Sequence, residues 1–259
     1  MQFAEIIRLI GFTDILKVCM LMIAGAKETR IRLPDGSSLL VELDQLPELF
    51  NNLLHIHYYR DYAFQRTAMP RSGWKVIDVG AYIGAYTIWC ARRVGDKGEV
   101  VALEPHPRNF TLLKRNININ RLRNVKVLPY ALSSYDGGAT LYSPKYRALA
   151  SLRREHVEYL SGGPVEKYNV KCITLRTLLE TLNLNHVELL KLDIEGLEYK
   201  VLENSLDILD RIERLVVEAH LDICSIPEID QLLRNAGYQT SIKLDTQAEN
   251  QAFIIAIRK

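Results

Sequence analysis

The stretch Val76-Ile-Asp-Val-Gly-Ala-Tyr-Ile-Gly84 runs from an apolar segment directly into a turn that contains two glycines. The apolar segment predicts a strand, and residues 87–94 behind the turn have the pattern of an amphipathic helix. Glycines at positions 80 and 84 let the backbone of such a turn approach a ligand closely. The stretch therefore predicts a strand, a glycine turn and a helix that together form a ligand-binding unit.

The next apolar segment, Val100-Val-Ala-Leu-Glu-Pro105, ends in an acidic residue. A carboxylate at this strand end can accept hydrogen bonds from both hydroxyls of a ribose, so we expect a nucleoside site with Glu104 as the ribose ligand. The turn reads Asp78-x-Gly80-x-x-x-Gly84 instead of GxGxxG, which disfavours the pyrophosphate of a dinucleotide. The alternative is a glycine turn that serves only the packing of the strand against the helix.

Beyond Pro70, predicted strands alternate with predicted helices. The strands are expected at 75–79, 99–103, 125–128, 188–192, 215–217 and 253–257, and the helices at 87–94, 110–120, 197–202 and 229–235. Such alternation is typical of an α/β fold with a mostly parallel sheet and helices on both faces. Residues 143–166 interrupt the alternation without a clear period and predict a mobile loop or lid.

We expect residues 1–70 to form an N-terminal extension of a domain that spans residues 71–259. Helical spacing of apolar residues from 3 to 26 is broken near Gly11, and Pro34-Asp-Gly36 between two alternating segments predicts a hairpin. A further helical segment is expected at 46–59.

The apolar run at residues 15–26 is interrupted by Lys17 and is shorter than the roughly 20 residues of a membrane span. We interpret it as part of a buried amphipathic helix and not as a peripheral membrane anchor. The 33 basic and 31 acidic residues give a formal charge of +2, which supplies no argument for a nucleic-acid partner. The four cysteines stand singly, so neither a zinc knuckle nor a disulfide framework is expected, and we expect a cytoplasmic location.

Two motifs resemble those of a known family. Asp78-x-Gly80-x-x-x-Gly84 resembles motif I of class I S-adenosylmethionine-dependent methyltransferases, and Leu189-Leu-Lys-Leu-Asp-Ile-Glu-Gly-Leu-Glu198 looks like the Lys-Ile-Asp-Val-Glu-Gly-x-Glu signature of the FkbM family of these enzymes. Segments with the family's order and rough spacing are Tyr130-Ala-Leu-Ser133, Cys172-Ile-Thr-Leu-Arg-Thr-Leu-Leu179 and Val216-Val-Glu-Ala-His220. The similarity covers about residues 74–220, although the chain has Arg176 where the family often has Asp.

The resemblance implies a Rossmann-like class I methyltransferase fold with a seven-stranded sheet. It also implies S-adenosylmethionine as methyl donor, S-adenosylhomocysteine as product, and a hydroxyl of a sugar, glycolipid or other small metabolite as acceptor. The motif positions that it assigns to the cofactor are Asp78, Gly80, Ala81, Tyr82, Gly84, Glu104, Pro105, Tyr130 and Ala131. Asp78 would face the cationic methionine end, Glu104 the ribose and Tyr130 the adenine.

Titratable groups follow two predicted strands that we expect to be neighbours, with Asp193 and Glu195 after one strand and Glu218 and His220 after the other. An alcohol loses its proton on becoming an ether, and a general base in reach contributes about 10²–10⁴-fold to the rate. We therefore predict Asp193, Glu195 and His220 as catalytic residues, His220 having the side chain best suited to base work at neutral pH.

Structural alternatives stay open for these three residues. Asp193 can cap the helix expected at 197–202, Glu195 can serve packing or capping, and His220 can be an exposed loop residue. Together with Glu218 the same groups offer ligands for a divalent cation, but no closely spaced metal motif enforces one, and we predict no metal. We also expect strand alternation to turn Lys191 away from Asp193.

Three rival functions remain for the chain. The first is an NAD(P)-dependent sugar oxidoreductase, which the missing GxGxxG and the missing Tyr-x-x-x-Lys pair disfavour. The second is a nonenzymatic protein that keeps the cofactor fold as a scaffold, and the third is a nucleic-acid methyltransferase, which the near-neutral charge disfavours. The sequence indicates neither the individual acceptor nor the oligomeric state.

Overall fold

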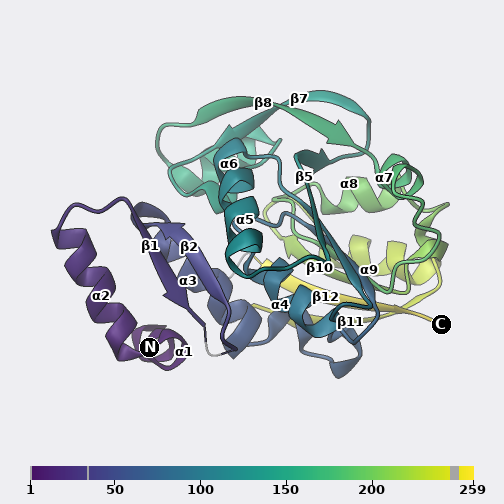
Figure 1. Cartoon of the computed structure of the whole chain (residues 1–259). Coiled ribbons are helices and arrows are strands. Elements are labelled where there is room, and N and C mark those ends of the chain that lie inside the picture. The colour runs from purple at the N-terminus through teal and green to yellow at the C-terminus, as the bar shows by residue number, and fades with distance from the viewer. Residues whose placement is uncertain (1, 34, 246–250) are drawn as a thin grey trace.

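A seven-stranded sheet forms the centre of the molecule (Figure 1). The computed structural model describes residues 2–33, 35–245 and 251–259. In the order β11-β12-β10-β9-β3-β4-β5, the strands span Tyr238–Leu244, Gln251–Arg258, Arg214–His220, Leu189–Leu192, Lys75–Val79, Glu99–Leu103 and Val125–Leu128. Six strands run in one direction, and β12 runs in the opposite direction between β10 and β11. The predicted α/β fold with a mostly parallel sheet is confirmed. Strand β11 was not predicted.

Helices cover both faces of the sheet, as predicted. Alternate side chains of β3 enter different apolar clusters: Val76 packs in the cluster that contains α4 (Ala85–Val94) and α5 (Pro107–Ile119), and Ile77 in the other. The second cluster contains α7 (Leu175–Thr181), α8 (Glu198–Glu203) and α9 (Ile226–Asn235). A strand that is buried on both faces in this way needs mostly apolar residues, and in β3 the exception is the buried Asp78.

The glycine turn after β3 lies against the turn that follows β9. Gly80 has a φ of 75°, and a Cβ built there would lie 1.8 Å from the carbonyl oxygen of Asp193. Gly84, with a φ of 98°, is the residue before the first turn of α4. Glycine at position 80 is therefore required both by its backbone conformation and by the contact between the two turns.

The N-terminal extension packs into the first apolar cluster and has no separate core among the described residues. Its elements are α1 (Gln2–Ile10), α2 (Phe12–Ile23), β1 (Glu28–Arg32), β2 (Ser38–Glu42), α3 (Leu46–Leu53) and the π-helical turn η2 (Leu54–Tyr58). The break at Gly11, the antiparallel hairpin and the helical segment after it are confirmed. The division of the chain near residue 70 stays a prediction.

The interpretation of residues 15–26 as a buried helix is wrong. Of the residues of α2, Val18 is buried, whereas the large apolar side chains that α2 leaves exposed are Phe12, Leu16, Met20, Met22 and Ile23. The reason is its position, because α2 lies at the margin of the molecule beside α1 and β1 (Figure 1). None of the described helices is long and apolar enough to cross a membrane.

A second, three-stranded sheet of order β6-β8-β7 follows β5 in the chain. Its strands are β6 (Tyr130–Leu132), β7 (Gly137–Ser143) and β8 (Glu166–Ile173), and the long β7–β8 pair lies at the top of the view in Figure 1. The 143–166 stretch, expected to be a loop, contains the 3₁₀ turn η5 (Arg147–Leu149) and the helix α6 (Arg154–Ser161). Elements of three and eight residues are too short to show a hydrophobic period in the sequence.

Candidate active site

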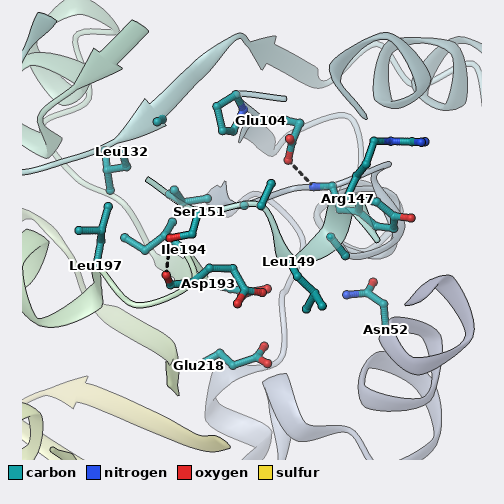
Figure 2. A pocket seen from close by; sticks show the side chains of 18 of the residues that line it. Asn52, Glu104, Leu132, Arg147, Leu149, Ser151, Asp193, Ile194, Leu197 and Glu218 are labelled. Atoms are coloured by element: carbon teal, nitrogen blue, oxygen red, sulfur yellow. Dashed lines mark hydrogen bonds between the residues drawn. The ribbon is translucent and has the colours of Figure 1, made fainter. Parts of the chain in front are cut away.

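A cleft opens where the carboxyl ends of the parallel strands meet (Figure 2). Glu104, after β4, lies on one side of it, and Asp193 and Glu218, from β9 and β10, lie on the other. Of the residues predicted to bind a cofactor, those that line the cleft are Gly80, Tyr82, Glu104, Pro105, Tyr130 and Ala131. The extension contributes Glu48, Asn51, Asn52, His55 and Tyr62, and the segment after β7 contributes residues 147–152.

The Glu104 carboxylate is held by backbone amides at the mouth of the glycine turn. The amides of Tyr82 and His106 each donate to it at 2.9 Å, and the side-chain amide of Asn109 lies at 3.4 Å. Burial raises the pKa of Glu104 to about 8, although these donors act in the opposite direction. The position predicted to bind a ribose thus carries an oriented carboxyl group at the cleft wall.

Asp78 lies beneath the cleft. Its fully buried carboxylate accepts a hydrogen bond from Thr87 Oγ1 at 2.5 Å and lies 3.3 Å from Lys191 Nζ. Within the described chain, Asp78, Ala81 and Gly84 are not part of the cleft lining, in contrast to Gly80 and Tyr82. The roles assigned to these residues stay predictions.

Lys191 points toward Asp193, so the expectation that it points away was wrong. Its Nζ lies 3.0 Å from Asp193 Oδ2 and donates to the carbonyl oxygen of Gly80 at 3.0 Å. Residues two apart in a strand project from the same face, which is the reason for this pairing. Burial alone lowers the pKa of Lys191, but the charges of Asp193 and Asp78 outweigh burial and raise this pKa above its ordinary value. A buried ammonium ion thus joins the two acidic strand ends.

Asp193 and Glu218 lie together under the hydroxyl of Tyr62. This hydroxyl donates to Glu218 Oε2 at 2.5 Å and lies 3.5 Å from Asp193 Oδ2. Burial, followed by the charge of Asp193, raises the pKa of Glu218 to about 8. The alternative role of Asp193 as a helix cap is wrong, because α8 begins after Leu197 without a side-chain cap.

The turn after β9 explains the Glu-Gly-x-Glu pattern of the sequence. Glu195 and Gly196 have φ angles of 54° and 94°, and the Glu198 carboxylate accepts hydrogen bonds from the amides of Ile194 and Gly196 at 3.1 Å. Glu198 Oε1 also lies 3.0 Å from Nδ1 of His220. The second glutamate of the pattern therefore ties the turn to the end of β10.

Glu195 and His220 form a buried cluster with a histidine from the 143–166 stretch. Glu195 Oε2 lies 3.0 Å from Nε2 of His156 and 3.2 Å from Nε2 of His220. His220 is 1% exposed, which makes the exposed-loop alternative wrong. The predicted convergence of the four titratable groups is confirmed, since ligand atoms of Asp193, Glu218 and His220 lie within 4.8 Å of one another. Glu195 lines the cleft, and His220 lies behind it.

The sequence analysis missed His156, which lies far along the chain from the strand ends that it contacts and had no signal except its residue type. Tyr62 belongs to an aromatic cluster of the extension, Tyr58, Tyr59, Tyr62 and Phe64, which the sequence predicts as core, with part of an acceptor pocket as the alternative. In the structure Tyr62 lines the cleft, and its hydroxyl donates to Glu218.

Comparison with known proteins places this geometry in context. The family model described as the methyltransferase FkbM domain matches residues 78–240. The methyltransferase sdnD of Sordaria araneosa is 24% identical over 251 residues, which cover 85% of this chain and 96% of that protein. The hexuronic acid methyltransferase AglP of Haloferax volcanii is 27% identical over 182 residues, 70% of each chain. The METTL16 MTase domain has a similar fold, with a TM-score of 0.52 at 15% identity over 86% of this chain and 73% of that structure.

Proposed function

Because the chain belongs to the FkbM family of methyltransferases, we propose that it transfers the methyl group of S-adenosylmethionine to a hydroxyl oxygen of a small, carbohydrate-containing acceptor. The observation that carries this proposal is the layout of the cleft, with the Glu104 carboxyl at one side and the Asp193 and Glu218 carboxyls at the other. The carboxyl of Glu104 suits the ribose of the cofactor. The carboxyls of Asp193 and Glu218 suit the place of methyl transfer, because the sulfonium of the donor is cationic and the acceptor hydroxyl loses a proton.

The residues present fit this cofactor. Gly80 offers backbone without a side chain at the wall, and Glu104 offers the oxygens of its carboxyl group to the two ribose hydroxyls. In the proposal the predicted residues that contact the cofactor are those that line the cleft, Gly80, Tyr82, Glu104, Pro105, Tyr130 and Ala131, while Asp78, Ala81 and Gly84 act from behind this lining. Tyr130 and Ala131 line the cleft and would flank the base.

S-adenosylmethionine would supply a methyl group bound to a sulfonium sulfur, and the neutral thioether that remains after transfer is a good leaving group. The acceptor oxygen forms the new C–O bond as the S–C bond breaks, and the hydroxyl proton passes to a carboxylate of the chain. Asp193 and Glu218 are placed for this proton, because both line the cleft and share the Tyr62 hydroxyl. Glu195 is a further proton acceptor in the lining, and His220 behind it is a positioning residue in this proposal. Much of the rate would come from holding the reactants in line.

A carbohydrate acceptor is supported by the cleft wall that the extension builds. Asn51, Asn52 and Glu48 line it and offer both hydrogen-bond donors and acceptors, which a compound with several hydroxyls requires. The relative AglP, described as a hexuronic acid methyltransferase, supports the same class. We therefore propose sugars and uronic acids as the first acceptors to screen.

The cofactor part is tested by calorimetric titration with S-adenosylhomocysteine. Glu104→Ala is expected to weaken binding at least tenfold. Its matched control, Glu99→Ala, changes the same residue type at the opposite end of β4 and is expected to bind as the wild type does. Equal affinity in all three proteins, or binding of NAD(H) in place of S-adenosylhomocysteine, would contradict the proposal.

The transfer part is tested with a labelled methyl donor and a panel of neutral sugars and uronic acids. Asp193→Asn and Glu218→Gln are expected to keep their affinity for S-adenosylhomocysteine and to lower kcat by about 10²–10⁴-fold, the usual contribution of a general base. Asp96→Asn, on the exposed loop before β4, is the control for charge loss. Unchanged kcat in both cleft variants would refute the assigned proton acceptors.

A further inference from the structure

Two histidines and a glutamate meet behind the cleft wall from three separate segments. His156 lies on α6, Glu195 follows β9 and His220 ends β10. All three side chains are buried, and one nitrogen or oxygen atom from each lies within 4.8 Å of the others. Neither the family signature nor the methyl-transfer chemistry proposed above requires His156 at this place.

The two imidazole rings are oriented by carboxylates on their far sides. Nδ1 of His156 lies 2.7 Å from Asp222 Oδ2, and Nδ1 of His220 lies 3.0 Å from Glu198 Oε1. A neutral ring that donates its Nδ1–H to a carboxylate turns the lone pair of Nε2 the other way. Both Nε2 atoms face the same oxygen of Glu195. This carboxylate–histidine arrangement is the one that holds metal-binding histidines in their binding tautomer.

Three electron-pair donors that face one another repel unless positive charge lies between them. Two protons can supply that charge by making two imidazolium ions, each between two carboxylates, in rings whose centres lie 5.4 Å apart. One divalent cation supplies the same charge at a single point. The rings could then stay neutral, each donating to its own carboxylate.

The surrounding charge also favours a dication. Cationic side chains that contact this neighbourhood are Lys191, at Asp193, and Arg153, which lies 3.5 Å from the carbonyl oxygen of Gly196. The carboxylates of the same neighbourhood are more numerous: Asp193, Glu195, Glu198 and Asp222. Negative charge in excess that is withdrawn from water is costly unless it is paired or coordinates a metal.

We propose that His156, Glu195 and His220 bind one divalent first-row transition-metal ion. An ion about 2.1 Å from each ligand separates neighbouring ligands by about 3.0–3.4 Å, depending on its geometry. The two nitrogen-to-oxygen distances, 3.0 and 3.2 Å, match this separation. Two imidazoles and one carboxylate suit manganese, iron, cobalt, nickel or zinc better than magnesium or calcium, which prefer oxygen ligands.

The ion would lie at the cleft wall, because Glu195 is both a ligand and part of the lining. A Lewis acid there would lower the pKa of an acceptor hydroxyl next to Asp193. This use in catalysis rests on the proposed function, whereas the binding of the ion does not. The ion would also tie α6 to the ends of β9 and β10.

The test is titration of chelator-treated protein with Co²⁺, followed by visible absorption and by calorimetry. The wild type is expected to bind one equivalent and to show the absorption bands of a protein-ligated Co²⁺. His156→Asn and Glu195→Gln are expected to lower the affinity at least tenfold. The control is His186→Asn, which removes an exposed histidine that also lies near two carboxylates, those of Glu188 and Glu213, and it should bind as the wild type does.

Several results would overturn the proposal. One is that the wild type binds none of Co²⁺, Zn²⁺ and Mn²⁺, and another is that His156→Asn binds them as tightly as the wild type does. Loss of binding in Glu218→Gln with retention in His156→Asn would place the ion on Asp193, Glu218 and His220 instead, since these also lie within 4.8 Å of one another.

Folding and function are checked separately on the same samples. Each variant is titrated with S-adenosylhomocysteine and unfolded by heat. If His156→Asn does not fold, Asp222→Asn replaces it and is expected to lower Co²⁺ affinity about 10–100-fold, as loss of a group that orients a ligand does. If the metal-free protein binds S-adenosylhomocysteine but no Co²⁺, the metal-site proposal is refuted and the proposed function is not. Protein that binds Co²⁺ but no S-adenosylhomocysteine refutes the proposed function alone.

Discussion

At the scale of single residues, Gly80 joins the two halves of the cleft. Its φ of 75° lies in the left-handed region, and its missing side chain leaves room for the carbonyl oxygen of Asp193. The turn that would hold the cofactor and the turn that carries a proposed proton acceptor are therefore in backbone contact. A change at position 80 must affect both.

Gly80→Ala is expected to destabilise the protein by more than about 4 kcal/mol, because strain of about 1–2 kcal/mol adds to a clash with backbone that cannot move away easily. Gly73→Ala is the matched control. Gly73 has a φ of 85°, but a Cβ there meets nothing within 4 Å, so only the strain should remain. Urea unfolding of both variants measures the difference, and equal losses would show that the contact with Asp193 is unimportant.

The raised pKa of Glu104 predicts that the stability of the protein depends on pH. The folded chain keeps the proton of Glu104 up to about pH 8, whereas the unfolded chain loses it near its ordinary value of 4.5. Between these values the folded state binds more protons, so the free energy of unfolding falls as the pH rises. Glu104→Gln cannot ionise and should gain stability relative to wild type over this window, by a few kcal/mol at most.

The measurement is denaturant unfolding of wild type and Glu104→Gln at several pH values between about 5 and 8.5. Glu99→Gln, at the opposite end of β4, controls for the removal of a carboxylate. A difference between wild type and Glu104→Gln that is the same at every pH would contradict the assignment.

At the scale of elements, Glu198 holds the first turn of α8 to the end of β10. Burial alone raises the pKa of this carboxyl, but His220 outweighs burial and lowers the pKa below its ordinary value, so the group is a buried carboxylate with a charged or donating partner. Removal of one member of such a pair costs about 3–5 kcal/mol.

Glu198→Ala is accordingly expected to lower the free energy of unfolding by about 3–5 kcal/mol. Glu203→Ala, on the exposed face of the same helix, should change it by no more than about 0.5 kcal/mol. Thermal and urea unfolding check both values. Similar losses in the two variants would mean that Glu198 does not hold the turn.

The regular elements of the main sheet were predictable because each leaves a local mark. Strands β3, β4 and β5 are rich in apolar, mostly β-branched residues, and their bounds in the structure match the predicted ones. Strand β11, at the edge of the sheet, mixes buried, half-buried and exposed residues and is rich in polar side chains, so it leaves no such mark. The burial of α2 was misjudged for a related reason, since apolar spacing predicts a helix but not whether another element covers it.

At the scale of the whole molecule, two asparagine side chains attach the extension to the main domain. Their amide groups bond the backbone of β2 in the way that a neighbouring strand would. Asn116, on α5, and Asn120, which follows the last residue of this helix, exchange hydrogen bonds with the backbone of β2. Asn116 bonds both the amide and the carbonyl of Leu40, and Asn120 does the same with Ser38. These two amides therefore help to hold the hairpin, and with it the cleft wall that the extension supplies, alongside the shared apolar cluster and the ion pairs of Glu28 and Glu42.

Asn116→Ala leaves the amide and carbonyl of Leu40 without this partner, at a cost of about 1–3 kcal/mol for a buried polar group. We expect hydrogen exchange at Leu40 to become about 10–100-fold faster, and kcat of methyl transfer to fall as the wall loosens. The control is Asn118→Ala, which removes an exposed amide from the same helix. Unchanged exchange at Leu40 would show that the hairpin is held in another way.

The candidate site was predictable to the extent that it follows the strand ends. Glu104, Asp193 and Glu195 line the cleft because the carboxyl ends of parallel strands meet at one edge, which sequence patterns can show. Tyr62 and His156 reach the same edge from the extension and from α6. Their positions depend on how those segments pack over the sheet, and no local pattern records that packing.

The place of β12 has a consequence for the order of synthesis. β12 lies between β10 and β11, although the chain makes it after both. Since a nascent chain emerges from its N-terminal side, β10 keeps an open edge while the segments up to β12 are still being made. An open strand edge readily pairs with other chains. The strand that carries Glu218 and His220 is thus open to mispairing at the ribosome until β12 is made, and slow translation between β10 and β12 would lengthen that exposure.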